Sequence, residues 1–320
     1  MSTAPTPTSA AAPGPLHVAV LMGGWSAERE VSLATGAGVA QALRGRGYRV
    51  TVVNVGRDVR ALLAALEPRP DVVFNALHGR GGEDGVIQGL LEMLGLPCTH
   101  SGVLASAIAM DKPMTKRVLE TVGVRSPRGT VVTRAEVALG RPLPGPFVVK
   151  PVNEGSSVGV AVVRDDQACP CPAGAPEGAA EELVLVEEFV PGRDLFVAVL
   201  GDRALGVTEV RAKGGFYDYE AKYTNGLAEH VLPAAIPDAV RDEAMRFALL
   251  AHRTLGCRGL TRSDLRWDDS KPGLDGLYFL EINNQPGMTP LSLAPEQAAH
   301  IGLSYADLCA WMIEDALRRA

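Results

Sequence analysis

The stretch YFLEINNQPGMTPLSL, residues 278–293, is the segment around which the rest of the chain is organised. Its first five residues, YFLEI, are mostly aromatic or aliphatic and predict a strand. Side chains two positions apart on a strand lie on the same face, so Glu281 and Asn283 point the same way. Their oxygens are the ligands that Mg²⁺ prefers. The Pro-Gly pair at positions 286–287 then ends the strand.

A second stretch, LTRSDLRW at residues 260–267, is the expected partner of this strand. It alternates in the same way, with Arg262 and Asp264 on one face. The connection DDSKPGLDG is rich in Asp, Gly and Pro and predicts a hairpin. Antiparallel pairing sets Asp264 beside Glu281 and Asn283. Two carboxylates on one patch are costly without a counter-charge, so the alternative is an exposed, salt-bridged ribbon.

The composition indicates a soluble globular protein of two or three domains. The chain has 320 residues, of which 47% are hydrophobic and 21% charged. A net charge of −6, with no basic run, argues against a nucleic-acid partner. No apolar run has the length needed to cross a membrane. We therefore expect neither nucleic acid nor membrane as a partner.

The first residues and the cysteines indicate a cytoplasmic protein. The opening MSTAPTPTSAAAPGP lacks the basic and apolar regions of a signal peptide, and its composition predicts a disordered tail over residues 1–15. The five cysteines are an odd number and scattered, as expected of reduced thiols. Cys169 and Cys171 form a C-x-C in a Pro- and Gly-rich loop without further metal ligands nearby.

Strands alternate with helices in the first hundred residues, which predicts a parallel sheet covered by helices. Ser26 is expected to cap the first helix. A Walker motif is absent, and Gly36-Ala37-Gly38 lies inside a predicted helix, so the region is Rossmann-like without the dinucleotide fingerprint. The expected strands are 16–22, 49–55, 71–77 and 96–99, and the expected helices are 26–46 and 86–94.

Beyond these, runs rich in β-branched residues indicate a second, antiparallel α+β domain. A third region begins with two more strands and contains the aromatic cluster GGFYDYEAKYT at residues 214–224. Ser304 and Asp307 have the spacing of a helix cap before the last helix. The expected strands are 129–134, 147–152, 158–164, 183–190, 194–200 and 204–211, and the expected helices are 111–122, 238–255 and 304–319.

Two glycine-rich loops are candidates for ligand contact. HGRGGEDG, residues 78–85, has four glycines that let a ligand approach the backbone closely, although a flexible loop is the plain alternative. NEGSSVG, residues 153–159, follows Lys150 and lies between two strands. Such a loop can close over phosphates with backbone N–H groups and hydroxyls, and an ordinary hairpin loop is the alternative there.

With these motifs in order, the chain resembles the D-alanine–D-alanine ligases of the ATP-grasp superfamily. The resemblance covers about residues 16–320, apart from 165–182. The combination of EGSSVG with E-x-N-x-x-PGMT is its most specific part. The motifs are GGWSAEREVSL, HGRGGEDG, AMDKPMTK, FVVKPVNEGSSVG, LVEEFVPGRD, FYDYEAKYT, GLTRSDL and FLEINNQPGMTPLSL.

The resemblance implies an α/β and α+β protein with three-domain ATP-grasp architecture. We expect an N-terminal Rossmann-like substrate domain at residues 16–103, a central lid domain at 104–190 and a C-terminal catalytic domain at 191–320. The implied reaction joins two D-alanine molecules through an acyl phosphate for peptidoglycan synthesis. The implied cofactors are ATP and Mg²⁺ or Mn²⁺, with two ions, and a homodimer is expected.

The resemblance also assigns roles to residues of this sequence. Arg262 and Gly287 would face the oxyanion, and Ser156 with Tyr223 would tie the lid to Glu28. The catalytic set is Glu28, Ser156, Tyr223, Arg262 and Gly287. The substrate-binding set is Glu28, His78, Ser292 and Leu293. The ATP-binding set is Lys112, Lys150, Ser157, Glu187, Glu188, Val190, Asp194 and Lys222. The metal-binding set is Asp264, Glu281 and Asn283.

Three alternatives stay open at this point. A D-alanine–D-lactate ligase or another ATP-grasp amino-acid ligase has the same motifs, and Tyr223 is the residue expected to favour dipeptide over ester. A non-catalytic nucleotide-binding protein is disfavoured by the intact Asp264, Glu281 and Arg262. A nicotinamide oxidoreductase is disfavoured by the missing fingerprint. Asp194 departs from the family, being shorter than the Glu expected at the ribose, and Asn284 stands where Thr is more frequent.

Overall fold

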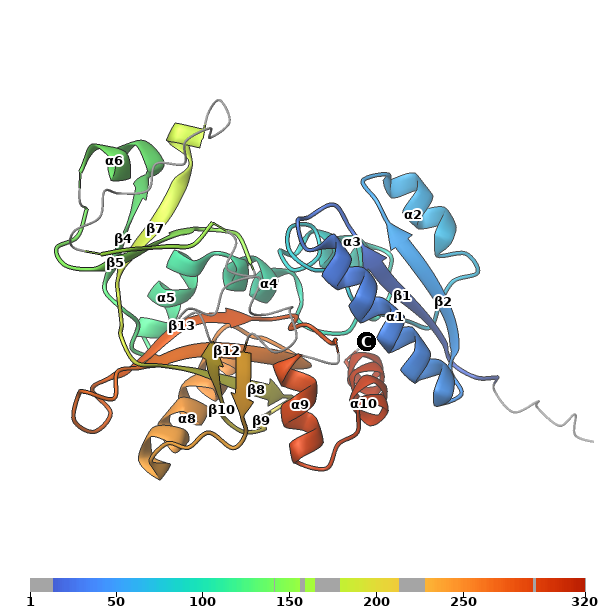
Figure 1. Cartoon of the computed structure of the whole chain (residues 1–320). Coiled ribbons are helices and arrows are strands. Elements are labelled where there is room, and N and C mark those ends of the chain that lie inside the picture. The colour runs from blue at the N-terminus through green and yellow to red at the C-terminus, as the bar shows by residue number, and fades with distance from the viewer. Residues whose placement is uncertain are drawn as a thin grey trace, which may run out of the picture.

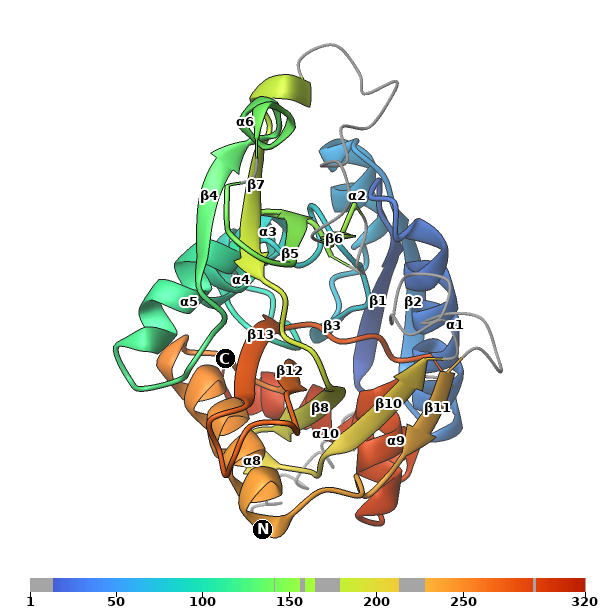
Figure 2. The same ribbon diagram turned by 60° about the vertical axis from the view of Figure 1, so that its left-hand side comes forward.

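The computed structural model describes residues 14–140, 142–155, 159–164, 179–212, 228–289 and 292–319, which form three β-sheets with covering helices (Figure 1). The tail before Gly14, the C-x-C segment, and the aromatic cluster from residue 214 to 224 lie outside these ranges. Each sheet is formed by consecutive parts of the chain. Figure 2 shows that the second sheet stands above the third, with the first sheet beside them.

The first sheet is parallel, in the order β2-β1-β3, as the alternation of strands and helices predicted. Its central strand β1 is apolar because it is covered on both faces. The predicted strand at 96–99 forms only an isolated bridge between Cys98 and Val73. The elements are β1 (His17–Gly23), α1 (Arg29–Gly45), β2 (Arg49–Val55), α2 (Val59–Ala65), β3 (Val72–Asn75) and α3 (Val86–Met93).

The second sheet is antiparallel, in the order β4-β7-β5-β6, which confirms the change of pattern read from the sequence. Phe147, Val149, Val184 and Val186 form its small core. The elements are β4 (Gly129–Thr133), α6 (Arg134–Leu139), β5 (Phe147–Pro151), β6 (Ala161–Val163), the 3₁₀ turn Ala179–Glu181 and β7 (Leu183–Glu188).

The third sheet is antiparallel and has the order β11-β10-β8-β12-β13, with β9 paired to β8. The elements are α4 (Val103–Met110), α5 (Lys112–Glu120), β8 (Arg193–Leu200), β9 (Arg203–Ala204), β10 (Thr208–Ala212), β11 (Ala228–Val231), α8 (Asp238–Thr254), β12 (Leu260–Trp267), β13 (Leu277–Asn283), α9 (Leu293–His300) and α10 (Tyr305–Arg318). Helices α4 and α9, like α2 and α6 of the first two domains, were not expected from the sequence.

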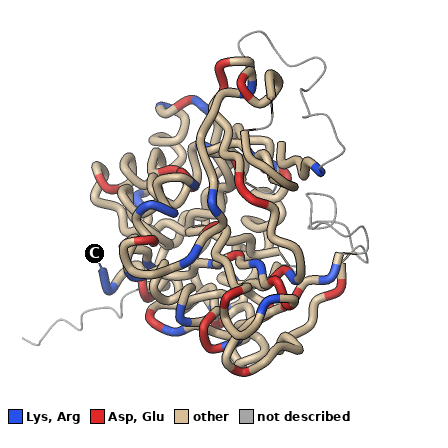
Figure 3. The backbone as a smooth tube through the Cα atoms, turned by 90° about the vertical axis from the view of Figure 1, so that its left-hand side faces the viewer, with Lys and Arg blue, Asp and Glu red and all other residues tan. Residues whose placement is uncertain are grey.

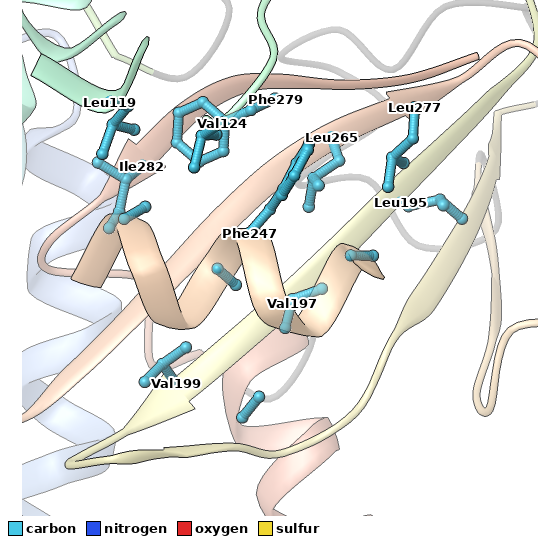
Figure 4. Packing of buried hydrophobic residues seen from close by; sticks show 14 of the residues in the cluster. Leu119, Val124, Leu195, Val197, Val199, Phe247, Leu265, Leu277, Phe279 and Ile282 are labelled. Carbon is cyan, nitrogen blue, oxygen red and sulfur yellow. The ribbon is translucent and has the colours of Figure 1, made fainter. Parts of the chain in front are cut away.

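One face of the third sheet packs on α8 and forms the largest core. Phe247 of α8 packs against this face, where it lies in one cluster with Val197 of β8 and Leu265 of β12 (Figure 4). Ala105 of α4 and Leu119 of α5 belong to the same core. Helices α4 and α5 lie at the start of the expected central domain, residues 104–190. Their apolar faces are nevertheless buried against the third sheet, so in the fold they belong with the C-terminal domain.

The C-terminal helix α10 joins the first and third sheets. Leu308 and Met312 of α10 pack in one cluster with Val18 and Phe74 of the first sheet and Leu260 of the third. Figure 1 shows α10 lying beside α1. Ser304 caps α10 by accepting a hydrogen bond from the Asp307 N–H (3.2 Å), as predicted. The first strand and the last helix of the described residues therefore share one core.

The expected cap at Ser26 is wrong. The residue before α1 is Glu28, and its side chain makes no capping hydrogen bond. The Ser26 hydroxyl accepts a hydrogen bond from the Glu28 N–H (3.2 Å), ahead of the helix, and donates one to the His78 carbonyl (2.6 Å). Ser26 therefore ties the loop after β1 to the loop after β3, which places Glu28 near His78.

The described part of the chain carries basic and acidic residues in mixed order. Figure 3 shows them interspersed along the backbone. Within the described ranges, no helix combines the length and apolar character needed to cross a membrane.

Gly36 has a packing function in α1. A Cβ atom at this position would lie 2.5 Å from the Cβ of Met22 on β1, so the helix and the strand approach closely only through glycine. Gly45, at the end of the same helix, has no atom within 4 Å of a Cβ built there. Gly36 is therefore explained by helix–sheet packing, whereas a Cβ atom on Gly38 would lie 3.2 Å from the Tyr305 hydroxyl of α10.

We predict that Gly36→Ala lowers the free energy of unfolding by about 1–3 kcal/mol, because the added methyl overpacks the contact with Met22. Gly45→Ala is the matched control and should raise it by roughly 0.5–1 kcal/mol, since Ala favours a helix over Gly. Urea unfolding of both variants measures this. Equal effects of the two substitutions would contradict the packing function.

Candidate functional site

Two adjoining cavities meet at the β12–β13 hairpin. Lys112, Glu154 and Glu281 line both of them, so the cavities are continuous. Every residue assigned to the site that lies within the described ranges lines one cavity or the other. These residues are Glu28, His78, Lys112, Lys150, Glu187, Glu188, Val190, Asp194, Arg262, Asp264, Glu281, Asn283, Gly287, Ser292 and Leu293.

Four further residues of the assigned site lie outside the described residues: Ser156, Ser157, Lys222 and Tyr223. Within the glycine-rich loop at 153–159, Glu154 lines both cavities and Gly155 lines the second. The Glu154 carbonyl accepts a hydrogen bond from Lys112 Nζ.

The hairpin pairs its polar residues in the expected register. Asp264 lies opposite Glu281, and Arg262 lies opposite Asn283. The register shifts after Asp264, which leaves Leu280 as a bulged residue without an opposite partner on β12. Bulges of this kind re-aim side chains beside functional sites.

The bulge decides which side chains of β13 face the cavities. Phe279 and Ile282, three positions apart, both pack in the core below the sheet. Leu280 and Glu281 both line the first cavity, on the opposite face of the sheet. Strict alternation cannot place neighbouring residues on one face, so the bulge is required for this arrangement.

Both carboxylates have cationic neighbours. Arg262 donates to Asp264 from Nε (2.6 Å) and Nη2 (2.9 Å), and Lys112 Nζ lies 3.4 Å from Glu281 Oε2. Asp264 is buried. These pairs offset the cost of two carboxylates on one face, a cost that the sequence already indicated.

The oxygens of Asp264, Glu281 and Asn283 form a donor set that suits Mg²⁺ or Mn²⁺. Two carboxylates and one amide are hard ligands, and Mg²⁺ commonly completes its coordination with phosphate oxygens and water. Within the described ranges there is no group of three or more His, Cys, Asp or Glu residues arranged for a metal. The chemistry of the hairpin therefore fits a hard cation bound together with a phosphate group.

The first cavity lies between the second and third sheets and contains a buried ion cluster. Glu187, at the end of β7, pairs with both Lys116 and Lys150. Burial would raise the pKa of the Glu187 carboxyl, but the two ammonium groups outweigh burial and lower it. Burial lowers the pKa of Lys116 to about 8, against the attraction of Glu187 and with repulsion from Lys150. Glu187 is therefore held as a carboxylate in one orientation.

Lys116 is a residue that the sequence reasoning did not assign to the site. It lies four positions after Lys112 on α5, so both lysines project from one face of the helix. That spacing was the available signal. Arg266 was missed as well: it donates to the Val190 carbonyl (2.6 Å) and to Asp194 (2.5 Å), and so fixes the segment between β7 and β8.

The second cavity receives residues from the first domain. His78 Nδ1 lies 2.9 Å from Glu83 Oε1, and its Nε2 lies 3.2 Å from Thr35 Oγ1. Burial lowers the pKa of His78, but the hydrogen bond and charge of Glu83, with the charge of Glu28, outweigh burial and raise it. Glu83 was not assigned from the sequence, although it lies in the quoted HGRGGEDG motif.

Glycines in the loop at residues 78–85 allow close packing against other parts of the protein. A Cβ on Gly79 would lie 2.6 Å from Glu28 Oε2, and one on Gly81 would lie 2.2 Å from the Trp25 ring. Both glycines also have positive φ, which side chains disfavour. The segment from Trp25 to Glu28 therefore approaches the backbone of this loop closely, and His78 and Glu83 of the same loop line the second cavity.

The N-terminus of α9 faces the second cavity. Ser292 precedes the helix, and Leu293 is its first residue. The Ser292 hydroxyl accepts a hydrogen bond from the Thr289 N–H (2.9 Å). Free N–H groups and the helix dipole make such an end suitable for a carboxylate. The unexpected helix thus gives the predicted pair Ser292 and Leu293 a physical basis.

Comparison with known proteins identifies close relatives. Residues 58–101 match the family model "D-ala D-ala ligase N-terminus", and residues 124–314 match "D-ala D-ala ligase C-terminus". The chain is 57% identical over 308 residues to the D-alanine–D-alanine ligase of Sphingopyxis alaskensis, covering 95% of this chain and 99% of the relative. It is 55% identical to that of Rhizorhabdus wittichii, covering 95% and 97%.

Solved structures show the same similarity. The D-alanine–D-alanine ligase from Bacillus anthracis complexed with ATP has a TM-score of 0.76 at 27% identity, covering 96% of this chain and 98% of that one. A second structure of that ligase has a TM-score of 0.78 at 29% identity, covering 95% and 98%. The similarity therefore extends over all three sheets.

We predict that His78 titrates above its ordinary value of 6.5. Its protonation then stabilises the fold fully below pH 6.5, and this contribution is lost as the pH rises through the folded pKa. Nuclear magnetic resonance titration measures the midpoint. Glu83→Gln should lower it, whereas Glu92→Gln, on the exposed side of α3, should leave it unchanged. A wild-type midpoint below 6.5 would show that burial outweighs the pair with Glu83.

Proposed function

Because the chain belongs to the D-alanine–D-alanine ligase family, it is an ATP-dependent ligase of D-alanine, and we propose that its two joined cavities bind ATP and the two amino acids. The product is D-alanyl-D-alanine, a precursor of peptidoglycan. The observation that carries the assignment of cavities is the shared wall of Lys112, Glu154 and Glu281, at which a phosphate donor in one cavity meets an acceptor in the other.

We assign ATP to the cavity between the second and third sheets. The adenine would lie against Glu187, Glu188 and Val190, where Glu187 is held by its lysines. Lys112 and Lys150 supply positive charge for the phosphates, and we assign Ser157 and Lys222 to the same task. Asp194 is the candidate for the ribose; its pairing with Arg266 keeps it in the cavity wall.

Asp264, Glu281 and Asn283 are the proposed ligands of Mg²⁺ or Mn²⁺, with two ions expected. When bound, these cations neutralise the charge that develops on the transferred phosphoryl group. The contribution of the protein is the paired strands that hold the three oxygens on one face. Lys112, which lies beside Glu281, is positioned to contact the phosphate at the same place.

We propose that the first D-alanine binds in the second cavity, with its ammonium group on Glu28 and His78 in the wall. A carboxylate oxygen of this D-alanine attacks the γ-phosphorus of ATP, and the bond to the ADP oxygen breaks. The resulting acyl phosphate carries a good leaving group on the carbon that must accept the amine. Exclusion of water protects this intermediate from hydrolysis.

The second D-alanine then completes the reaction. Its carboxylate would bind the N-terminus of α9 at Ser292 and Leu293, and its amine, once it has lost a proton, attacks the acyl carbon. The carbon–oxygen bond to phosphate breaks, and inorganic phosphate leaves with the electron pair. Arg262 and the Gly287 N–H are the proposed donors to the oxyanion. Ser156 and Tyr223 are proposed to link the loop at 153–159 to Glu28, with Tyr223 favouring dipeptide over ester.

The proposed function predicts phosphate release from ATP that requires D-alanine and a divalent cation. A panel of D-amino acids, with D-lactate as competitor, should give mainly D-alanyl-D-alanine. Chelation should abolish turnover, and Mg²⁺ or Mn²⁺ should restore it. Glu281→Gln should lower turnover by about 10²-fold or more at the same Mg²⁺ concentration, because a neutral amide balances less charge. Mostly ester product, or full turnover in chelator, would contradict these assignments.

We further propose a homodimer in the cytoplasm. Val86, Met93 and Leu104, on α3 and α4, are 61%, 88% and 72% exposed, and the two helices pack together. Burial against a second copy would remove this apolar surface from water. For the compartment, the support is that Cys98, Cys257 and Cys309 are free thiols, as in reducing surroundings.

Light scattering should give twice the mass of one chain, and the double substitution Met93→Lys and Leu104→Glu should give a monomer, because charge opposes burial of the surface. Leu139→Lys is the control, since Leu139 is equally exposed but lies in the second domain. A monomeric wild type at all concentrations would exclude this assembly.

A further inference from the structure

We propose that Gln285 is a positioning residue that fixes the D-alanine cavity against the phosphate-transfer site through a buried amide clasp with Asn75. This proposal rests on the proposed function. The clasp joins the end of β3 in the first domain to the turn after β13 in the third. The two residues lie 210 positions apart along the chain.

The side chain of Gln285 makes two hydrogen bonds, and both go to the first domain. Its Oε1 accepts from Asn75 Nδ2 (2.8 Å), and its Nε2 donates to the Leu77 carbonyl. Gln285 is 1% exposed and Asn75 is fully buried. Buried amides are costly unless paired, so the bonds hold a single arrangement.

Each end of the clasp is directly connected to a residue of the site. Leu77 precedes His78, which lines the second cavity. Gln285 lies two residues after Asn283, and its backbone N–H donates to Asn283 Oδ1 (2.9 Å). The clasp therefore fixes the distance between a wall of the D-alanine cavity and a proposed metal ligand.

Asn75 and Asn284 extend the same contact to the loop that carries Glu83. Asn75 Nδ2 also donates to the Gly82 carbonyl (2.9 Å). Asn284 Nδ2 donates to Ser106 Oγ (2.7 Å) and lies 3.4 Å from the Glu83 carbonyl. The residue that departs from the family pattern, Asn284, thus has a buried role beside the clasp.

The two cavities depend differently on the first domain. Residues of the first domain that line the second cavity include Glu28, His78 and Glu83. The lining of the first cavity begins, in chain order, at Lys112, so it receives no described residue of the first domain. A looser clasp should therefore impair the use of D-alanine and leave the binding of ATP unchanged.

Gln88 provides a matched control. It is buried, and its Nε2 donates to the Gly82 carbonyl (2.7 Å), so it supports the same loop. Its hydrogen bond does not reach the third domain, and the Gly82 carbonyl keeps its bond from Asn75 if Gln88 is replaced. A purely structural effect of removing a buried amide should appear equally at both positions.

The experiment compares Gln285→Met with Gln88→Met, each of which replaces the amide by an apolar chain of similar length. Gln285→Met should lower kcat/KM for D-alanine by about 10²-fold, because a displacement of about 1 Å costs that much. The Kd for ATP, from calorimetry, should stay within about twofold. Gln88→Met should keep kcat/KM for D-alanine within about threefold of wild type.

Gln285→Asn gives a second reading if the Met variant does not fold. It keeps an amide but is one methylene shorter, so it cannot reach both Asn75 Nδ2 and the Leu77 carbonyl. It should lower kcat/KM for D-alanine and leave the Kd for ATP unchanged, in the same way as Gln285→Met. A folded Gln285→Asn variant with wild-type kcat/KM for D-alanine would overturn the proposal.

The other outcomes are also decisive. Equal losses in the Gln285 and Gln88 variants, or a parallel loss of ATP binding, would show that Gln285 serves stability alone. Failure of the proposed function would appear differently, as a wild type that releases no phosphate in the presence of D-alanine.

Discussion

The pairing of β12 with β13 is the constraint on which the rest of the structure depends. It places Asp264 opposite Glu281, and two carboxylates on one face repel each other and lose hydration. The arrangement persists because Arg262 on the same strand and Lys112 on α5 supply opposite charge. Phe279 and Ile282 hold the other face in the core, so the hairpin cannot turn its polar side away.

The other two domains add groups that the hairpin does not possess. The second sheet contributes Lys150 and Glu187, which α5 stabilises through Lys116. It is connected to the third sheet through Gly192, where a Cβ would lie 2.1 Å from the Trp267 carbonyl. The first domain contributes Glu28 and the loop from His78, and buried side chains connect it to β13. Residues from all three domains therefore line the two cavities, and a different set of contacts holds each domain in place.

Buried polar groups connect the domains where apolar packing would leave their relative position less defined. The apolar core shared by α10 and the first sheet stabilises the contact between the domains. Apolar contact has no preferred direction, so this core does not fix their orientation. Hydrogen bonds are directional, and the Asn75–Gln285 pair accepts one geometry. Apolar burial and polar pairing therefore have different tasks at this boundary: the first stabilises the assembly of domains, and the second orients it.

The sequence by itself determined most strands and helices, the hairpin that carries Asp264, Glu281 and Asn283, and the membership of the family, because these depend on local alternation and motif spacing. The tertiary structure alone decided the bulge at Leu280, the role of Ser26, the start of α9 and the contacts of Lys116 and Gln285. Such features arise where segments far apart in the chain meet. Their partners are set by the packing of whole domains, which no local pattern records.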